Sequence, residues 1–267
     1  NICYYEQGMD ESARNRRQLA NDLRQAIARD ELRVLYQPQR SLKTHEISGY
    51  EALLRWHHPQ RGVVSPADFI PIAEETGEVM RLGEWVLRSA CAEAAKWENP
   101  DKIAVNLSPV QLLQPDLPEI VTRILLETGL SPRRLELEIT ETAIISDKVR
   151  ALHSLRRIKA LGVSVAMDDF GTGYSSLDTL HSFPFDKIKI DKSFLLQADQ
   201  NAQACAIIRA VLALGRSLNI PVLAEGVETE SQLALLIAEE CDEAQGYYFG
   251  RPAAPPSLSQ YGIAVNG

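Results

Sequence analysis

Short apolar or alternating segments recur along the chain, separated by stretches with the periodicity of amphipathic helices. Eight segments have the length and alternation of strands: 33–37, 46–54, 102–108, 134–140, 163–169, 186–191, 221–226 and 241–249. Helical spacing is typical of the stretches between them, among them 84–97, 117–128, 148–161, 202–218 and 230–239. Because strands that alternate with helices form parallel βαβ units, the pattern predicts a single α/β domain with a TIM-type (β/α)8 barrel.

A doubly wound open sheet is the alternative architecture for the same alternation. No GxGxxG motif follows the first strand, and no Gly/Ser-rich linker or change of composition divides the chain. Before the first strand, residues 10–30 are polar, with Leu19 and Leu23 at helical spacing, which predicts an amphipathic lead-in helix. We therefore expect three segments: a linker helix from an upstream domain over 1–30, the barrel over 31–256, and a tail over 257–267.

Composition and charge restrict the classes of partner. The 267 residues are 45% hydrophobic and 24% charged, as in ordinary globular proteins, and the net charge is -8. Binding DNA or RNA requires clustered Lys and Arg, so we expect neither as a partner. No apolar run approaches the roughly 20 residues that span a bilayer, so we expect no membrane insertion of this domain. Because the chain begins at Asn1, we interpret it as a cytoplasmic piece of a larger multidomain or membrane-associated sensor protein.

Polar side chains with oxygen ligands gather where the predicted strands end, which is where barrel enzymes place their chemistry. The residues at these ends are Glu51, Asn106, Glu138, Asp168, Asp169, Lys189 and Glu225. Alternation puts Glu136 and Glu138 on one face of their strand, and Lys187 and Lys189 on one face of theirs. A single acid at a strand end is more often a helix cap or a solvated loop residue, but six such ends in one chain favour a shared site.

The chemistry of these side chains points to hard cations. Five carboxylates with a single lysine among them would repel one another unless cations intervene. All-oxygen ligands select Mg2+ or Mn2+ over zinc. The adjacent Asp168 and Asp169 are typical of a site with two metal ions, because one carboxylate can reach each ion.

Seven separated motifs resemble those of the EAL family, in the order in which that family has them. They are EALLR (51–55), VNLS (105–108), ELEITE (136–141), MDDFGTGYSSL (167–177), KIDKSF (189–194), AEGVET (224–229) and QGYYFGRP (245–252). The resemblance covers nearly everything from Tyr36 to Pro252 and implies a TIM-type barrel that opens cyclic di-GMP to linear pGpG with two Mg2+ or Mn2+ ions. We expect Ca2+ to inhibit such a site, because it is the larger ion and the poorer acid.

The resemblance also implies roles for single residues. By position, Glu51, Asn106, Glu138 and Asp168 resemble the ligands of one ion, and Asp168, Asp169 and Glu225 those of the other. The implied catalytic residues are Lys189, which holds the attacking water, Glu225, as base or as ligand only, and Glu51. Gln37, Arg55 and Gln245 match substrate-binding positions. Glu141 resembles the acid that steadies the loop FGTGYSS (170–176), which in the family couples homodimer formation to metal binding.

Two alternatives belong to other classes. The first is a catalytically silent receptor that binds cyclic di-GMP, although no catalytic position departs from the family's pattern. The second is a Mg2+-dependent barrel enzyme of the enolase type, which also gathers acids at strand ends but needs a Lys or His base facing a carboxylate substrate. Residues 9–23 resemble the join that follows a GGDEF cyclase-like domain in fused proteins.

Overall fold

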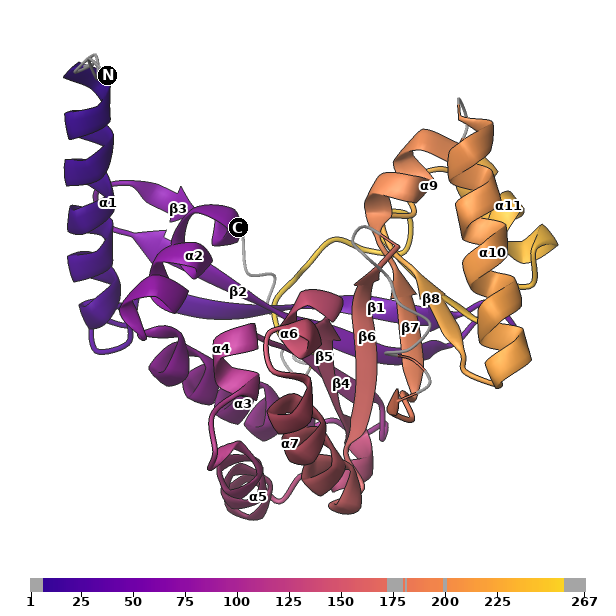
Figure 1. Cartoon of the computed structure of the whole chain (residues 1–267), viewed down its shortest axis with the longest axis horizontal. Coiled ribbons are helices and arrows are strands. Elements are labelled where there is room, and N and C mark those ends of the chain that lie inside the picture. Colours follow the sequence, from indigo (N-terminus) through magenta and orange to yellow (C-terminus); the bar gives the residue numbers. More distant parts are fainter. Residues whose placement is uncertain (1–6, 172–179, 181, 199–200, 257–267) are drawn as a thin grey trace.

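The structure is a computed structural model that describes residues 7–171, 180, 182–198 and 201–256. A barrel of strands lies at the centre, with most of the helices around it (Figure 1). The first helix, α1 (Gln7–Ala26), stands to one side with α2 (Pro66–Thr76) and β3 (Gly62–Val64). On the opposite side stand α9 (Lys192–Ala198), α10 (Ala202–Leu218) and α11 (Glu230–Ala238). Among the described residues, no helix has the length and hydrophobicity needed to cross a bilayer.

Eight strands close the barrel, as the sequence predicts. They are β1 (Leu32–Ser41), β2 (Ile47–His58), β4 (Lys102–Leu107), β5 (Leu135–Thr140), β6 (Ser164–Phe170), β7 (Lys187–Ile190), β8 (Val222–Ala224) and β9 (Glu243–Gln245). Their order is β1-β9-β8-β7-β6-β5-β4-β2, and pairing of β1 with β2 closes the ring. A further strand, β3 (Gly62–Val64), pairs with the outer end of β2 and was not predicted.

The prediction that all barrel strands are parallel is wrong for β1. This strand runs antiparallel to both of its neighbours, β2 and β9, whereas the other pairs of adjacent barrel strands are parallel. Residues 42–46, which join β1 to β2, are too few for a parallel crossover, which needs a dozen or more residues. A tight turn is therefore the connection that this spacing permits, and the first strand has no helix after it.

The helices that follow the other strands cover the outside of the barrel. Their bounds are α2 (Pro66–Thr76), α3 (Val79–Ala94), α4 (Pro109–Leu112), α5 (Leu117–Thr128), α6 (Glu141–Ile145), α7 (Lys148–Ala160), α9 (Lys192–Ala198), α10 (Ala202–Leu218) and α11 (Glu230–Ala238). The predicted helices at α5, α7, α10 and α11 are confirmed to within a residue at each end. The helix predicted to begin at Glu84 begins at Val79, and the lead-in helix ends at Ala26, not at residue 30.

Two hydrophobic clusters stabilise the molecule. The larger one fills the space between the barrel wall and the helices. The smaller one joins α1 to the β2–β3 hairpin and α2, through Leu23, Trp56 and Phe69 among others. Trp56 donates a hydrogen bond from Nε1 to Glu31 at 2.9 Å, just after α1. The second half of α1 thus packs against β2 and α2, at the side of the barrel.

Candidate active site

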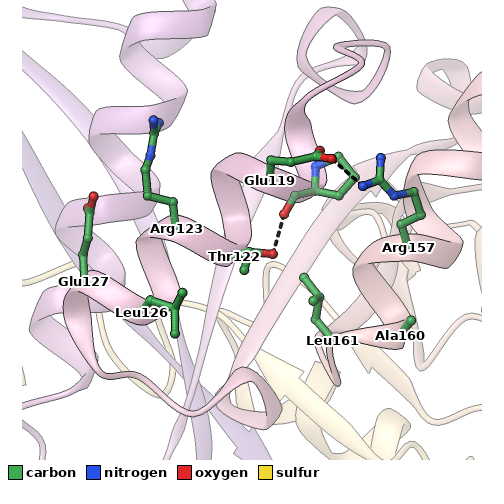
Figure 2. Close-up of a pocket in the computed structure, with 9 residues that line it drawn as sticks. Glu119, Thr122, Arg123, Leu126, Glu127, Arg157, Ala160 and Leu161 are labelled. Atoms are coloured by element: carbon green, nitrogen blue, oxygen red, sulfur yellow. Dashed lines mark hydrogen bonds and ion pairs between the residues drawn. The ribbon is translucent and has the colours of Figure 1, made fainter.

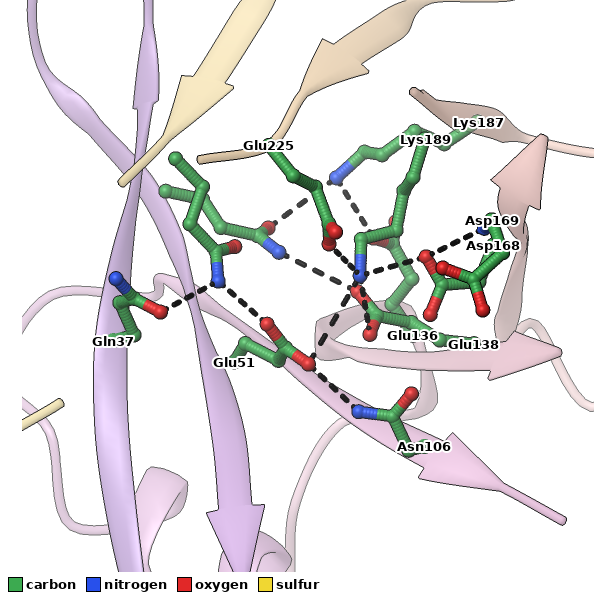
Figure 3. Close-up of polar contacts among 12 residues, drawn as sticks. Gln37, Glu51, Asn106, Glu136, Glu138, Asp168, Asp169, Lys187, Lys189 and Glu225 are labelled. Atoms are coloured by element: carbon green, nitrogen blue, oxygen red, sulfur yellow. Dashed lines mark hydrogen bonds and ion pairs between the residues drawn. The ribbon is translucent and has the colours of Figure 1, made fainter. Parts of the chain in front are cut away.

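The interior of the barrel positions the predicted site residues. Successive residues of a strand face opposite sides, so every second residue points inward. The structure brings together at one mouth of the barrel Gln37 (β1), Glu51 (β2), Asn106 (β4), Glu138 (β5), Asp168 and Asp169 (β6), Lys189 (β7), Glu225 (after β8) and Gln245 (β9). Figure 3 shows the labelled side chains among them, such as Glu51, Glu138 and Lys189, pointing toward one another from their separate strands.

Lys189 lies at the centre of the carboxylates. Its Nζ is 2.7 Å from Glu138, 2.7 Å from Glu225, 3.2 Å from Asp168 and 4.0 Å from Glu51. The lysine is 1% exposed, and burial alone would lower its pKa, but the four carboxylates outweigh burial and raise it well above its usual range. Lys189 is therefore a protonated donor at neutral pH.

Two amides hold the carboxylate of Glu51. Asn106 donates to its Oε1 at 2.7 Å, and Gln245 donates to its Oε2 at 2.5 Å. The amide of Gln245 also donates to Gln37 at 3.0 Å. Burial raises the pKa of Glu51, but Lys189 and the two amides outweigh this effect, so its pKa is lowered. Glu51 is thus held as a charged carboxylate.

A bulge in β6 turns two successive carboxylates toward the same space. The register between β6 and β7 shifts between Met167 and Phe170, and Asp169 has a left-handed backbone, with φ of 55°. Carboxylate oxygens of Asp168, Asp169 and Glu225 lie within 4.8 Å of one another. Burial, followed by the neighbouring acids, raises the pKa of Asp169 to about 6; burial is also the main cause that raises the pKa of Glu225 to about 8.

The donor set fits hard divalent cations. In the part of the chain that the structure describes, five carboxylates and the amide of Asn106 surround the ammonium group of Lys189, which leaves an excess of negative charge. Burial also raises the pKa of Glu138 well above its usual range, and Lys189 counters this only in part. Divalent cations with a preference for oxygen ligands, such as Mg2+ and Mn2+, would relieve this repulsion. Asp168 can serve two ions because it lies between Asp169 and the Lys189 cluster.

Two cavities adjoin at the mouth of the barrel. One, of about 340 Å³, is lined by Gln37, Glu51, Asp168, Glu225 and Gln245, together with Lys192, Glu228 and Tyr247 from the rim. The other, of about 310 Å³, is mostly apolar and is lined by Arg55 and Asn106 among others. Both are lined by Leu53, so they lie side by side. The mouth therefore has room for a ligand longer than one nucleotide.

Arg55 and Glu141 lie apart from the carboxylate cluster. Arg55 lines the apolar cavity, and its Nη1 donates to the carbonyl oxygen of Leu54 at 2.9 Å. Glu141 is buried at the first residue of α6, directly after β5. Most of the loop that it is predicted to steady, residues 172–176, lies outside the described residues. The role of Glu141 stays a prediction.

A larger groove lies away from the barrel mouth. It has a volume of about 540 Å³ and lies between α5 and α7 (Figure 2). Two of its charged side chains form an ion pair with each other at the surface, where Arg157 donates a hydrogen bond to Glu119 at 2.5 Å. Its walls are mainly apolar side-chain atoms such as those of Leu126 and Leu161, and the described residues that line it do not form a cluster of acids like the one at the mouth. We therefore place the chemistry at the barrel mouth.

Four polar residues beneath the site were not assigned a role from the sequence: Gln39, Glu136 and Lys187, which are buried, and Glu243, which is half-buried. Each lies two residues from a site residue on the same strand. This spacing was visible in the sequence for Glu136 and Lys187, which share a strand face with Glu138 and Lys189. Strand alternation was thus a signal that could have found Glu136, Lys187 and Glu243, whereas Gln39 lies beyond the predicted strand 33–37.

Fold and site together define a TIM-type barrel with an acidic, oxygen-rich centre at its mouth. The chain belongs to the EAL domain family, whose model matches residues 20–252. This confirms the resemblance drawn from the motifs, including the association of that family with cyclic di-GMP phosphodiesterases.

Several relatives cover almost the whole chain. It is 59% identical to an uncharacterized signaling protein of Caulobacter vibrioides, over 98% of this chain and 32% of that protein. It is 42% identical to the bifunctional diguanylate cyclase/cyclic di-GMP phosphodiesterase MucR of Pseudomonas aeruginosa, over 96% of this chain and 38% of that protein. The chain thus spans about a third of the length of these curated relatives.

Solved structures show the same fold. A structure of the PaMucR phosphodiesterase in complex with c-di-GMP is 42% identical, with a TM-score of 0.87, and the match covers 90% of this chain and 99% of that one. A structure of the EAL enzyme Bd1971 bound to cAMP and cyclic-di-GMP is 29% identical, with a TM-score of 0.89, over 95% of this chain and 70% of that one.

Proposed function

We propose that this chain hydrolyses cyclic di-GMP to linear pGpG in bacterial second-messenger signalling, with two Mg2+ or Mn2+ ions. The observation that carries the proposal is the convergence of five carboxylates, Asn106 and a protonated Lys189 at the mouth of the barrel. Support comes from the MucR phosphodiesterase, whose structure holds c-di-GMP and whose barrel superposes on this one.

The side chains divide into two ligand sets. Glu51, Asn106, Glu138 and Asp168 would hold one ion, and Asp168, Asp169 and Glu225 the other. When bound, such ions lower the pKa of water and offset the charge that develops on a phosphodiester. The amides of Asn106 and Gln245 keep the Glu51 carboxylate oriented toward the cluster.

Lys189 is the residue that orients the attacking water in this proposal. As a protonated donor among acids, it can offer a hydrogen bond to a water oxygen and add positive charge beside the phosphate. Glu225, 2.7 Å from Lys189, acts as a metal ligand or as the base that takes the water proton. The water oxygen bonds to phosphorus, one phosphorus–oxygen bond to ribose breaks, and the leaving oxygen takes a proton.

The substrate would occupy both cavities of the mouth. Gln37 and Gln245 line the polar cavity beside Glu51, where the scissile phosphate would lie. Arg55 lines the apolar cavity, where its planar guanidinium suits a phosphate or a base edge of the same ligand. A cyclic dinucleotide is long enough to reach from one cavity into the other, whereas a single small acid of the enolase type is not.

A silent receptor for cyclic di-GMP is the second candidate. The observation that favours it is the structural match to the FimX EAL domain of Pseudomonas aeruginosa bound to c-di-GMP, with 28% identity and a TM-score of 0.81. A receptor would need the cavities but not the full set of acids, so the complete set at this mouth favours hydrolysis.

The wider setting is also part of the proposal. We infer that the chain works as the cytoplasmic domain of a longer sensor protein and forms a homodimer, with the segment 1–30, which includes α1, as the link from an upstream domain. Support comes from the relatives, which are about three times as long as this chain. Light scattering of the purified chain would measure its oligomeric state.

The decisive experiment incubates the purified chain with cyclic di-GMP in Mg2+, Mn2+ or excess chelator and measures pGpG by chromatography. We expect pGpG in both metals and none in chelator. Full-rate hydrolysis in chelator would defeat the metal-dependent mechanism. Tight nucleotide binding without pGpG in either metal would establish the receptor.

A further inference from the structure

A second polar layer lies inside the barrel, beneath the candidate active site. Lys187 is its centre: its Nζ is 2.7 Å from Glu136 and 2.9 Å from Glu243. Lys187 and Glu136 are 4% and 1% exposed. Lys102 approaches Glu136 from the rim at 3.7 Å, so two lysines balance two glutamates in this layer. Burying such a cluster of charges costs desolvation free energy, so stability alone does not explain why the barrel contains it.

Each member of this layer shares a strand with a residue of the site above it. Glu136 lies two residues before Glu138 on β5, and Lys187 lies two residues before Lys189 on β7. Glu243 stands in the same relation to Gln245 on β9, and Gln39 to Gln37 on β1. Residues two apart on a strand point to the same side, so the lower layer directly supports the upper one.

Gln39 makes the hydrogen bonds that join the two layers. Its Oε1 accepts from Lys187 at 3.5 Å, and its Nε2 donates to the Oε1 of Glu138 at 3.5 Å. Lys187 can only donate and the Glu138 carboxylate accepts, so the amide can satisfy both in one orientation alone. The other oxygen of Glu138 faces Lys189 at 2.7 Å. Lys187 therefore fixes the amide, and the amide fixes one oxygen of Glu138.

We propose that Lys187 is a positioning residue, which acts through Gln39 to hold the Glu138 carboxylate in the orientation needed for metal binding. The inference rests on the proposed function, since it takes Glu138 as a metal ligand. Residues behind a metal ligand set the direction of its lone pairs, and their loss typically weakens metal affinity or activity by 10- to 100-fold. Lys187 does not touch the substrate cavities, so its effect is on the metal and not on nucleotide binding.

The test compares Lys187→Met with Lys159→Met, a matched control. Lys159 also pairs with a carboxylate, Asp186 at 2.8 Å, but it lies on α7 outside the barrel. Calorimetry would measure the Mn2+ affinity of each purified variant, and urea unfolding its stability. We expect Lys187→Met to weaken Mn2+ affinity about 10-fold and to lower kcat without a change in KM. Lys159→Met should leave Mn2+ affinity unchanged.

A second variant, Gln39→Leu, separates positioning from folding. It cuts the connection between the layers but keeps the Lys187 ion cluster, and we expect the same loss of Mn2+ affinity. Wild-type affinity in Gln39→Leu would overturn the inference, even if Lys187→Met does not fold. An equal loss in Lys159→Met would overturn it too. If the wild type binds Mn2+ but releases no pGpG, loss of affinity in both barrel variants would support the inference while the proposed hydrolysis fails.

Discussion

Asp169 adopts a left-handed backbone conformation in the bulge of β6. This region costs most residues about 1–2 kcal/mol, and Asp and Asn are among the few that enter it with a local hydrogen bond. In a regular strand, Asp168 and Asp169 would face opposite sides of the sheet. The bulge instead brings both carboxylates near Glu225. The strained backbone is therefore the local reason that two adjacent acids can share one site.

The first prediction compares Asp169→Asn with Asp169→Ala. Asparagine tolerates the left-handed backbone, so Asp169→Asn should unfold in urea with a free energy within about 0.5 kcal/mol of the wild type in chelator. The free energy of unfolding of Asp169→Ala should be about 1 kcal/mol lower than that of Asp169→Asn, because alanine does not tolerate the left-handed backbone. Both should lose Mn2+ affinity, because each removes a carboxylate. Wild-type turnover by Asp169→Asn would show that Asp169 is no ligand.

The second prediction concerns Glu51→Ala. This change removes a charged ligand and takes away the carboxylate that accepts hydrogen bonds from Asn106 and from the buried amide of Gln245. We expect pGpG release in saturating Mg2+ to fall below about a tenth of the wild-type rate, because an all-oxygen site that loses one ligand no longer holds its ion. The control is Glu75→Ala, since Glu75 pairs with Arg16 at the surface. Activity of Glu51→Ala above that level would remove Glu51 from the ligand set.

The periodicity of the sequence predicts most of the helices and strands, but it does not predict the direction of a strand. The stretch 117–128 has an uninterrupted helical pattern, and α5 has these bounds. Alternation predicts that β1 is a strand, but the alternation is the same in parallel and antiparallel strands. The prediction that β1 is parallel to its neighbours was therefore wrong. The signal that would have corrected it was the short connection after residue 41. The helix α2 was not predicted, although Ser65 as N-cap and Pro66 in the first turn are sequence signals for a helix start.

The third prediction belongs to α1. Leu23 on this helix is 1% exposed and lies in the smaller hydrophobic cluster with Trp56 and Phe69. Leu23→Ala should lower the free energy of unfolding by about 2–5 kcal/mol, as for other buried leucines. The matched control is Leu126→Ala. Because Leu126 is 79% exposed, this substitution should leave the free energy of unfolding almost unchanged. Equal urea midpoints for both variants would mean that α1 does not stabilise the barrel.

At the scale of the whole molecule, barrel closure decides how much of the site the sequence could predict. Residues of eight separate strands converge once the ring closes, so the acids and Lys189 were predictable. The place of Arg55 outside the carboxylate cluster did not follow from alternation, because Arg55 shares a strand face with Glu51. The pairing of β2 with β4 ends at Ala52, and β2 then leaves the barrel to pair with β3. Arg55 therefore lines the neighbouring cavity.

The fourth prediction is that divalent cations stabilise the folded molecule. The folded chain gathers five carboxylates around the ammonium group of Lys189, whereas in the unfolded chain these charges are far apart. Ions that bind only the folded state stabilise it by about 2.7 kcal/mol at a hundredfold excess over Kd. Thermal unfolding should therefore shift upward in Mg2+ or Mn2+ relative to chelator. An unchanged Tm at millimolar Mn2+ would contradict a metal site.

The fifth prediction separates binding from catalysis by exchanging the ion. Ca2+ accepts the same oxygen ligands as Mg2+ but binds at longer distances with more ligands, and it is a poorer acid toward water. Replacing Mg2+ by Ca2+ should therefore preserve binding of cyclic di-GMP in the two cavities while pGpG release stops, because the water beside Lys189 is neither ionised nor aligned. The measurement is nucleotide affinity and pGpG release side by side in Mg2+, Mn2+, Ca2+ and chelator. Adding Mn2+ back to the Ca2+ sample is the control and should restore turnover. Turnover in Ca2+ at the Mg2+ rate would show that ion geometry does not limit the reaction at this mouth.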